Sequence, residues 1–234
     1  MQFWWLSEYG GLLLHGLWIT VLLLVYSFIL GNIGAVLVGF GRISRNLLIS
    51  GSCLGFTSII RGTPLLVQIF LLYYGLGSVF ASWRWIHTTW AWSVLSDGFW
   101  YMVAALSIST AGYSGEVVRA ALLAVPRGEI EAARAFGLAP FQVIRLVWLP
   151  RALQSILPTL AGETVLLLKA TALASTITVM DLLGAANVVR AKTFRTYEPL
   201  LFVAVGYFLL TLIVEKLFRV VEQRGARTQA RQSA

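Results

Sequence analysis

The 234-residue chain has few of the side chains that metal proteins and most enzymes use. It has a single cysteine, Cys53, which excludes an internal disulfide and a thiolate metal cluster. Its two histidines, His15 and His87, are far apart in the sequence, which argues against a metal site. The G-x-x-x-x-G-K-[ST], G-x-S-x-G and H-E-x-x-H patterns are missing, so the sequence favours neither ATP binding by a P-loop nor a common hydrolase.

Charged residues are also scarce. They make up 12% of the chain, whereas soluble domains have about 25%. Hydrophobic residues make up 58%, and the mean hydropathy is +0.80. The net charge of +8 does not predict nucleic-acid binding, because the basic residues lie at the ends of apolar runs and form no dense basic face. This composition predicts a protein whose main solvent is a lipid bilayer.

Five apolar runs approach the length of about 20 residues that a helix needs to cross a bilayer. They are residues 12–38, 65–80, 99–123, 152–180 and 199–218. The second run is short, and residues 47–60 before it either extend it or lie partly in the membrane interface. We therefore expect an all-α integral membrane protein with five transmembrane helices in a domain of residues 1–222, followed by a polar cytoplasmic tail of residues 223–234.

The distribution of lysine and arginine sets the expected orientation. With the N-terminus outside, 13 of the 18 basic residues fall on the inner side, four fall outside, and Lys169 lies within a span. Basic residues are enriched in cytoplasmic loops, so this asymmetry predicts that the N-terminus is outside. An odd number of spans then places the C-terminus in the cytoplasm.

The polar insert between the third and fourth runs, residues 124–151, has a helical pattern of its own. Pro126 suits a first helical turn, and Glu129 and Glu131 suit the positive end of the helix dipole. Gly137 is typical of a helix end, because glycine adopts the left-handed conformation at low cost. The pattern predicts a helix, a glycine turn and a second helix from about Pro140 to residues 149–150.

This insert resembles the EAA loop of the permease subunits of bacterial ABC importers. The residues that match this family's spacing are Glu131, Ala132, Ala133, Gly137, Leu149 and Pro150. The resemblance implies that the insert is a cytoplasmic coupling helix seated on a partner ATPase. It also implies that the partner binds ATP and magnesium, so that this chain has no cofactor and is not itself an enzyme.

Two further segments resemble the polar amino acid permeases of that family. They are Arg-Gly-Thr-Pro-Leu-Leu-Val-Gln at residues 61–68 and Gly-Tyr-Ser-Gly-Glu-Val-Val-Arg at residues 112–119. The likeness spans nearly the whole chain, and histidine/lysine/arginine/ornithine and opine permeases fit best. It implies alternating access in the bacterial inner membrane. The implied partners are an ATPase dimer, an identical or homologous second permease, and an external amino-acid-binding protein.

Glu163 is the strongest candidate for binding a substrate. A carboxylate within a span is costly and usually faces a cavity or a partner. Lys169 lies six residues later, on roughly the opposite helix face. We expect Glu163 to face a cationic substrate, Thr164, Thr171 and Ser175 to line the same path, and Lys169 to offer a site for a substrate carboxylate. A structural ion pair with an arginine is the alternative for Glu163.

Two other sets of residues are candidates for gating or structural roles. Pro64 disfavours helix in the residue before it, so we expect a helix break that leaves Arg61 at the cytoplasmic interface, either as a gate or as a snorkelling side chain. Glu116 and Arg119 share a helix face, and a structural ion pair between them is favoured over a gate.

Two other classes of function remain as alternatives. An ion-coupled secondary transporter does not explain the insert, and a scaffold subunit without a pore does not explain Glu163.

Overall fold

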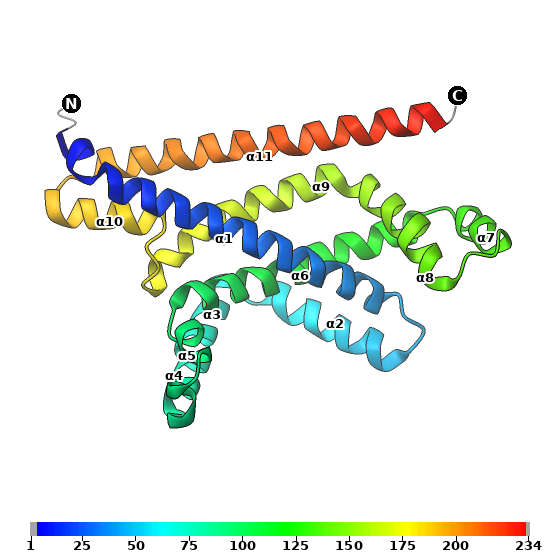
Figure 1. Cartoon of the computed structure of the whole chain (residues 1–234), viewed down its shortest axis with the longest axis horizontal. Helices are drawn as coiled ribbons and strands as arrows, with labels where there is room; N and C mark the ends of the chain where they lie inside the picture. The colour runs from blue at the N-terminus through cyan, green and yellow to red at the C-terminus, as the bar shows by residue number, and fades with distance from the viewer. Residues whose placement is uncertain (1–3, 233–234) are drawn as a thin grey trace.

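The computed structural model describes residues 4–232, and no strand occurs among them. Long helices run along the molecule, and short ones cap its two ends (Figure 1). The long helices are α1 (Trp4–Arg42), α6 (Gly98–Ala124), α9 (Leu149–Ala170) and α11 (Tyr197–Gln232). The predicted all-α class is confirmed.

Four helical stretches are long and apolar enough to cross a membrane. They are Trp5–Arg42, Leu65–Ser82, Pro140–Ile177 and Tyr197–Gln223. The predicted third span, residues 99–123, coincides with α6, which is long enough but is not in this set. The difference has a physical cause: α6 is the most enclosed long helix, so it faces its neighbours, and its sequence carries polar residues that lipid-facing helices avoid.

Helices α1 and α6 pack closely along their length because small residues lie between them. A Cβ atom added at Gly31 of α1 would lie 2.6 Å from the Cβ of Thr110. A Cβ added at Gly115 of α6 would lie 2.7 Å from Val38. Glycine at these positions lets the two backbones approach, as is common between helices in membranes. The α1 and α6 pair is therefore the centre of the bundle, and helices from the middle of the chain pack on it, whereas α11 packs on α9.

The predicted second span is divided as Pro64 requires. Helix α2 (Leu47–Gly62) ends, Thr63 and Pro64 are extended, and α3 (Leu65–Phe70) begins at once. The buried amide of Gln68 donates to the carbonyl oxygens of Ile60 and Thr63, at 2.8 and 3.1 Å. Gln68 thus satisfies carbonyl groups that the break would leave unpaired. The predicted break after Arg61 is confirmed.

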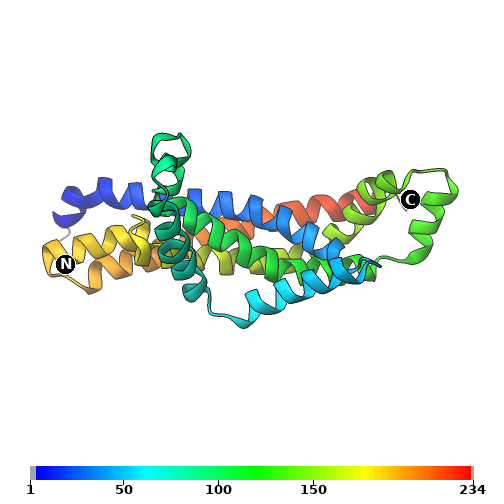
Figure 2. The same cartoon turned by 90° about the horizontal axis from the view of Figure 1, so that it is seen from below.

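The helix that starts at α3 continues through a π-helical turn, η1 (Leu71–Leu76), into α4 (Gly77–Ser82). A 3₁₀ turn, η2 (Arg84–Thr88), and α5 (Ala91–Leu95) complete a hairpin that projects from the body of the molecule (Figures 1 and 2). Trp85 and Trp90 of this hairpin are largely exposed, whereas Trp5 is buried and contacts Phe202 edge-on. These tryptophans therefore differ in burial, and they do not all lie on one exposed surface.

The insert forms α7 (Arg127–Ala135), a turn at Gly137 with φ of +79°, and α8 (Pro140–Val143). The predicted helix, glycine turn and helix are thus present. However, the second helix does not end at residues 149–150. It continues through a π-helical turn, η3 (Ile144–Trp148), into α9, with the N–H of Leu149 donating to the Ile144 carbonyl. The wider turn accommodates Pro150, which has no N–H to donate.

The fourth predicted run, residues 152–180, ends earlier than expected. Helix α9 tightens into a 3₁₀ segment, η4 (Thr171–Ile177), and Thr178 then adopts the left-handed conformation with φ of 67°. Asp181, which is fully buried, caps α10 (Leu182–Thr193) by accepting from the N–H of Gly184 at 2.9 Å. The fifth run lies within α11, which remains helical to Gln232, so most of the predicted tail has a helical backbone; residues 233–234 lie outside the described part.

Candidate functional site

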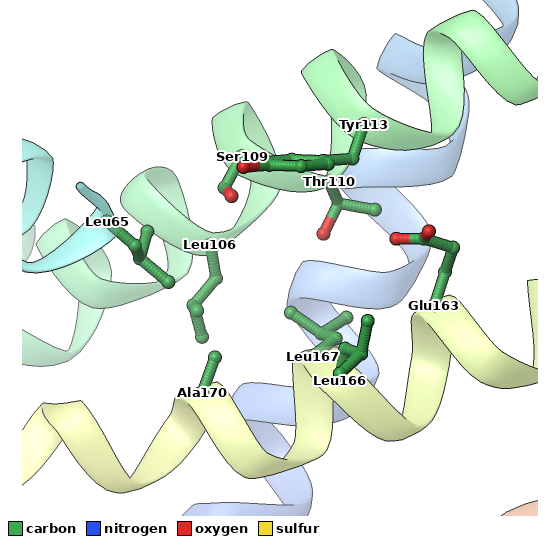
Figure 3. Close-up of a pocket in the computed structure, with 9 residues that line it drawn as sticks. All are labelled: Leu65, Leu106, Ser109, Thr110, Tyr113, Glu163, Leu166, Leu167 and Ala170. Atoms are coloured by element: carbon green, nitrogen blue, oxygen red, sulfur yellow. The ribbon is translucent and has the colours of Figure 1, made fainter. Parts of the chain in front are cut away.

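Two adjoining cavities lie between α6 and α9, and Glu163 of α9 lines both. The smaller, of about 280 Å³, has a mainly apolar wall with three polar residues from α6: Ser109, Thr110 and Tyr113 (Figure 3). The larger, of about 610 Å³, also has Arg61, Glu116, Ser155 and Thr159 in its wall. The smaller cavity is thus mainly apolar, the larger cavity is bordered by charged residues, and the carboxylate of Glu163 lies where the two meet.

Glu163 is half-buried, and its carboxylate points toward Thr110 of α6 (Figure 3). None of the ion pairs described among the side chains of residues 5–223 includes it. A carboxylate that is partly removed from water without a cation is costly, which favours a mobile or exchangeable positive partner. Two explanations were considered for Glu163, a cationic substrate and a structural ion pair. Among the side chains of residues 5–223, the structural ion pair is not observed.

The other predicted substrate residues are not brought to these cavities. Thr164 donates to the Leu160 carbonyl and lies on the α1 side of the helix. Thr171 donates to the Leu168 carbonyl and Ser175 to that of Ala172, and Lys169 is exposed. The helical repeat explains the separation: residues 163, 166, 167 and 170 form the stripe that faces the cavity, and residues 164, 171 and 175 belong to another.

Sequence analysis missed the contribution of α6 to this site. Tyr113 lies four residues after Ser109 and three after Thr110, so each of these hydroxyls is a neighbour of Tyr113 on the helix surface. A polar face within an otherwise apolar helix was the available signal. It was obscured because serine and threonine hydroxyls are often satisfied by the backbone of their own helix and then need no cavity.

Arg61 reaches the larger cavity from the end of α2. Its guanidinium carbon lies 5.8 Å from the centroid of the Tyr113 ring, and the Tyr113 hydroxyl donates to the Arg61 carbonyl at 3.4 Å. The side chain is exposed, and none of the ion pairs among the described residues includes it. Besides Glu116, which is paired, the cavity wall thus has one cation, Arg61, and one anion, Glu163, that take part in none of the ion pairs among the side chains of residues 5–223.

Glu116 forms the centre of a polar cluster that joins three helices. Its carboxylate accepts from the Nε atoms of Arg42 and Arg119, each at 2.7 Å, and from the Thr57 hydroxyl at 3.1 Å. The predicted pair with Arg119 is confirmed. Arg42 and Thr57 come from α1 and α2, far away in the sequence, so no local spacing indicated them. The cluster fixes the three helices beside the mouth of the larger cavity.

We expect Glu116→Gln to destabilise the protein by about 1–3 kcal/mol, because both arginines lose charge-assisted hydrogen bonds and Arg42 is left largely buried. The measurement is the thermal unfolding midpoint of the purified complex. The matched control is Glu129→Gln, since the pair of Glu129 with Arg151 is exposed and contributes about 0–1 kcal/mol. Equal midpoints for the two variants would show that the cluster is not a structural anchor.

The insert is held to the body at its base and exposed at its tip. Arg151 of α9 pairs with Glu129 of α7 at 3.2 Å, and the Trp148 indole donates to the Leu122 carbonyl at 2.9 Å. Beside them, a cavity of about 450 Å³ is lined by apolar residues and by Glu131, Arg127, Arg134 and Arg45. Phe136 is 88% exposed at the tip. An exposed apolar side chain beside charged residues, on a base that is bonded to α9, is suited to docking on another protein.

The matching residues of the insert occupy distinct positions. Glu131 and Ala132 are exposed on α7, whereas Ala133 is buried. Gly137 provides the turn between α7 and α8. Leu149 and Pro150 are half-buried at the start of α9, 12 residues or more beyond Gly137 in the sequence. The pattern therefore combines an exposed face with the structural residues that orient it.

Long apolar helices around a cavity with a charged mouth, together with a helical insert at one end, indicate a multi-pass membrane transport component. Comparison with known families agrees. Residues 27–227 match the family of binding-protein-dependent transport system inner membrane components, and the chain belongs to this family. Membership of this family of transport components favours neither a self-sufficient ion-coupled transporter nor a scaffold without a pore.

Individual relatives are similar over most of their length. The chain is 37% identical to the octopine transport system permease protein OccM of Rhizobium radiobacter over 210 residues, which cover 90% of this chain and 84% of OccM. It is 36% identical to the histidine/lysine/arginine/ornithine transport system permease protein HisM of Escherichia coli K12, covering 89% and 87%. A solved amino acid ABC transporter with histidines matches with a TM-score of 0.79 and 32% identity, covering 96% and 99%.

Proposed function

We propose that this chain is a permease subunit of an ATP-driven importer that moves cationic amino acids or opines across the bacterial inner membrane. The observation that carries the proposal is the carboxylate of Glu163 at the junction of two cavities, which takes part in none of the ion pairs among the side chains of residues 5–223. It is supported by the names of the relatives, which include transporters of octopine and of histidine, lysine, arginine and ornithine.

The proposed topology has five spans, with the N-terminus outside and the C-terminus inside. The bias of lysine and arginine supports the orientation. The length of α6, 27 residues, supports its role as the third span even though its composition is less apolar than that of its neighbours. In this arrangement, α10 and the tryptophan-bearing hairpin lie toward the outside, where an external binding protein delivers the substrate.

In this proposal, α7 and α8 couple transport to ATP hydrolysis by a separate subunit. The exposed tip at Phe136 and the fixed base at Glu129 support docking on a partner. An ATPase dimer binds ATP and magnesium below the membrane and contacts α7 of this chain and the corresponding helix of a second, identical or homologous permease. Closure of the ATPase dimer reorients the two permeases and produces alternating access.

The test is uptake of labelled arginine, histidine and glutamine into proteoliposomes. These contain the chain, the permease and ATPase that co-purify with it, and the external binding protein. We expect arginine to enter only with ATP, and glutamine to enter much more slowly, because only a cationic side chain offsets the charge of Glu163. Uptake of arginine without ATP would contradict the importer, and faster uptake of glutamine would contradict the cationic substrate class.

A further inference from the structure

Arg61 and Glu163 line the same cavity of about 610 Å³ but come from different helices. Arg61 extends from α2, and Glu163 projects from α9. No ion pair joins their side chains in the observed arrangement. The wall of the cavity therefore includes a guanidinium group, which is the same group that an arginine substrate carries.

The hold on Arg61 in its observed position is weak. Its guanidinium carbon lies 5.8 Å from the centroid of the Tyr113 ring, and a cation–π contact at an exposed site is weak. The side chain is exposed and emerges at the end of α2, directly before the extended residues Thr63 and Pro64. Arg61 can leave Tyr113 without breaking an ion pair or disturbing a buried contact. Tyr113 itself lines both cavities and thus lies beside either position.

We propose that Arg61 is the resting counter-ion of Glu163 and competes with the substrate for it. Arg61 exchanges between Tyr113, where this structure places it, and the carboxylate of Glu163, and the cationic group of an incoming substrate displaces it back to Tyr113. This inference rests on the proposed function of Glu163 as the substrate carboxylate. Arg61 then helps to determine specificity. A substrate with a neutral side chain cannot supply the positive charge that Glu163 loses when Arg61 is displaced.

The competition has a measurable consequence. If Arg61 occupies Glu163 for about nine-tenths of the time, the apparent dissociation constant for arginine is about tenfold above its intrinsic value. Arg61→Gln removes the competitor, so this variant should bind arginine about tenfold more tightly. Arg61→Lys retains the charge and should stay near the native affinity. Tighter binding is an outcome that damage to the structure does not produce.

The experiment measures equilibrium binding of labelled arginine to the whole permease and ATPase complex in lipid nanodiscs, without the external binding protein. The variants are Arg61→Gln, Arg61→Lys and Glu163→Gln. The matched control is Arg84→Gln, since Arg84 is an exposed arginine of the projecting hairpin that lines none of the cavities described above. Size-exclusion chromatography of each variant checks that the complex assembles.

The outcomes separate the inference from the proposed function. Tighter binding by Arg61→Gln, together with loss of binding by Glu163→Gln, supports both. Unchanged or weaker binding by Arg61→Gln, with loss by Glu163→Gln, overturns the counter-ion role and leaves the proposed function intact. Native binding by Glu163→Gln overturns the substrate carboxylate and, with it, the competition. Tighter binding by Arg84→Gln as well would assign the effect to total charge and overturn the specific role of Arg61.

Discussion

Replacing Glu163 by glutamine is expected to lower the efficiency of arginine uptake by about 10- to 100-fold. The estimate follows from the loss of a hydrogen bond between two charged groups, which is worth about 1.5–3 kcal/mol. Glutamine keeps the size of the side chain and its ability to accept a hydrogen bond, so the loss reports charge and not packing. The measurement is initial uptake in the proteoliposomes described above, over a range of arginine concentrations.

The matched control for this change is Glu215→Gln. Glu215 is an exposed carboxylate on α11, and it lines none of the cavities described above. Its replacement removes the same charge from another apolar helix and should leave uptake at the native level. If both variants transport arginine normally, Glu163 has a structural role, and selection occurs in the external binding protein or the second permease.

Reversing the charge of Glu131 is expected to weaken docking of the proposed ATPase and thereby abolish transport. Glu131 is exposed on α7, beside Arg127 and Arg134. Like charges placed together at an interface cost several kcal/mol, so Glu131→Lys should weaken docking by on the order of 100-fold and abolish uptake. The amount of ATPase that co-purifies and the uptake are measured on the same preparation. Glu131→Gln should give an intermediate result, and native uptake by Glu131→Lys would contradict the coupling role.

Gly137 offers an independent test of the same surface. A Cβ atom there meets nothing within 4 Å, so a substitution acts through the backbone conformation, which has φ of +79°. Asparagine adopts this left-handed conformation readily, whereas valine is strongly disfavoured in it. Gly137→Val should therefore reorient α8 relative to α7 and reduce uptake, while Gly137→Asn retains it. Equal uptake by the two variants would show that the angle of this turn is unimportant for coupling.

Local sequence signals predicted the features that local physics determines. Pro64 ended a helix where expected, Gly137 made the turn, and the apolar runs became helices. The Glu116 and Arg119 pair followed from their spacing of three residues. Each of these depends on backbone preferences or on the helical repeat, so a short window of sequence contains the whole cause.

Features that depend on contacts between distant segments were not predictable in this way. Arg42 joins Glu116 across 74 residues, and the polar face of α6 matters only because α9 lies beside it. The continuation of helix past Pro150 was also missed, because a π-helical turn removes the conflict that proline usually creates. Thr164, Thr171 and Ser175 were grouped with Glu163 by composition, although the helical repeat separates them.

The unbroken passage from α8 through η3 into α9 has a mechanical consequence. It makes the end of the insert and Glu163 parts of one continuous helical segment, and the 14 residues from Pro150 to Glu163 span about 20 Å at the rise of an α-helix. Pro158 lies within this stretch and removes one backbone hydrogen bond, but the helix continues through it, so we expect a tilt at one end to be passed to the other. For the proposed ATPase partner and arginine substrate, thermodynamic reciprocity predicts that a preference of the ATPase for one tilt changes the affinity for arginine, and that bound arginine changes the affinity for the ATPase by the same factor.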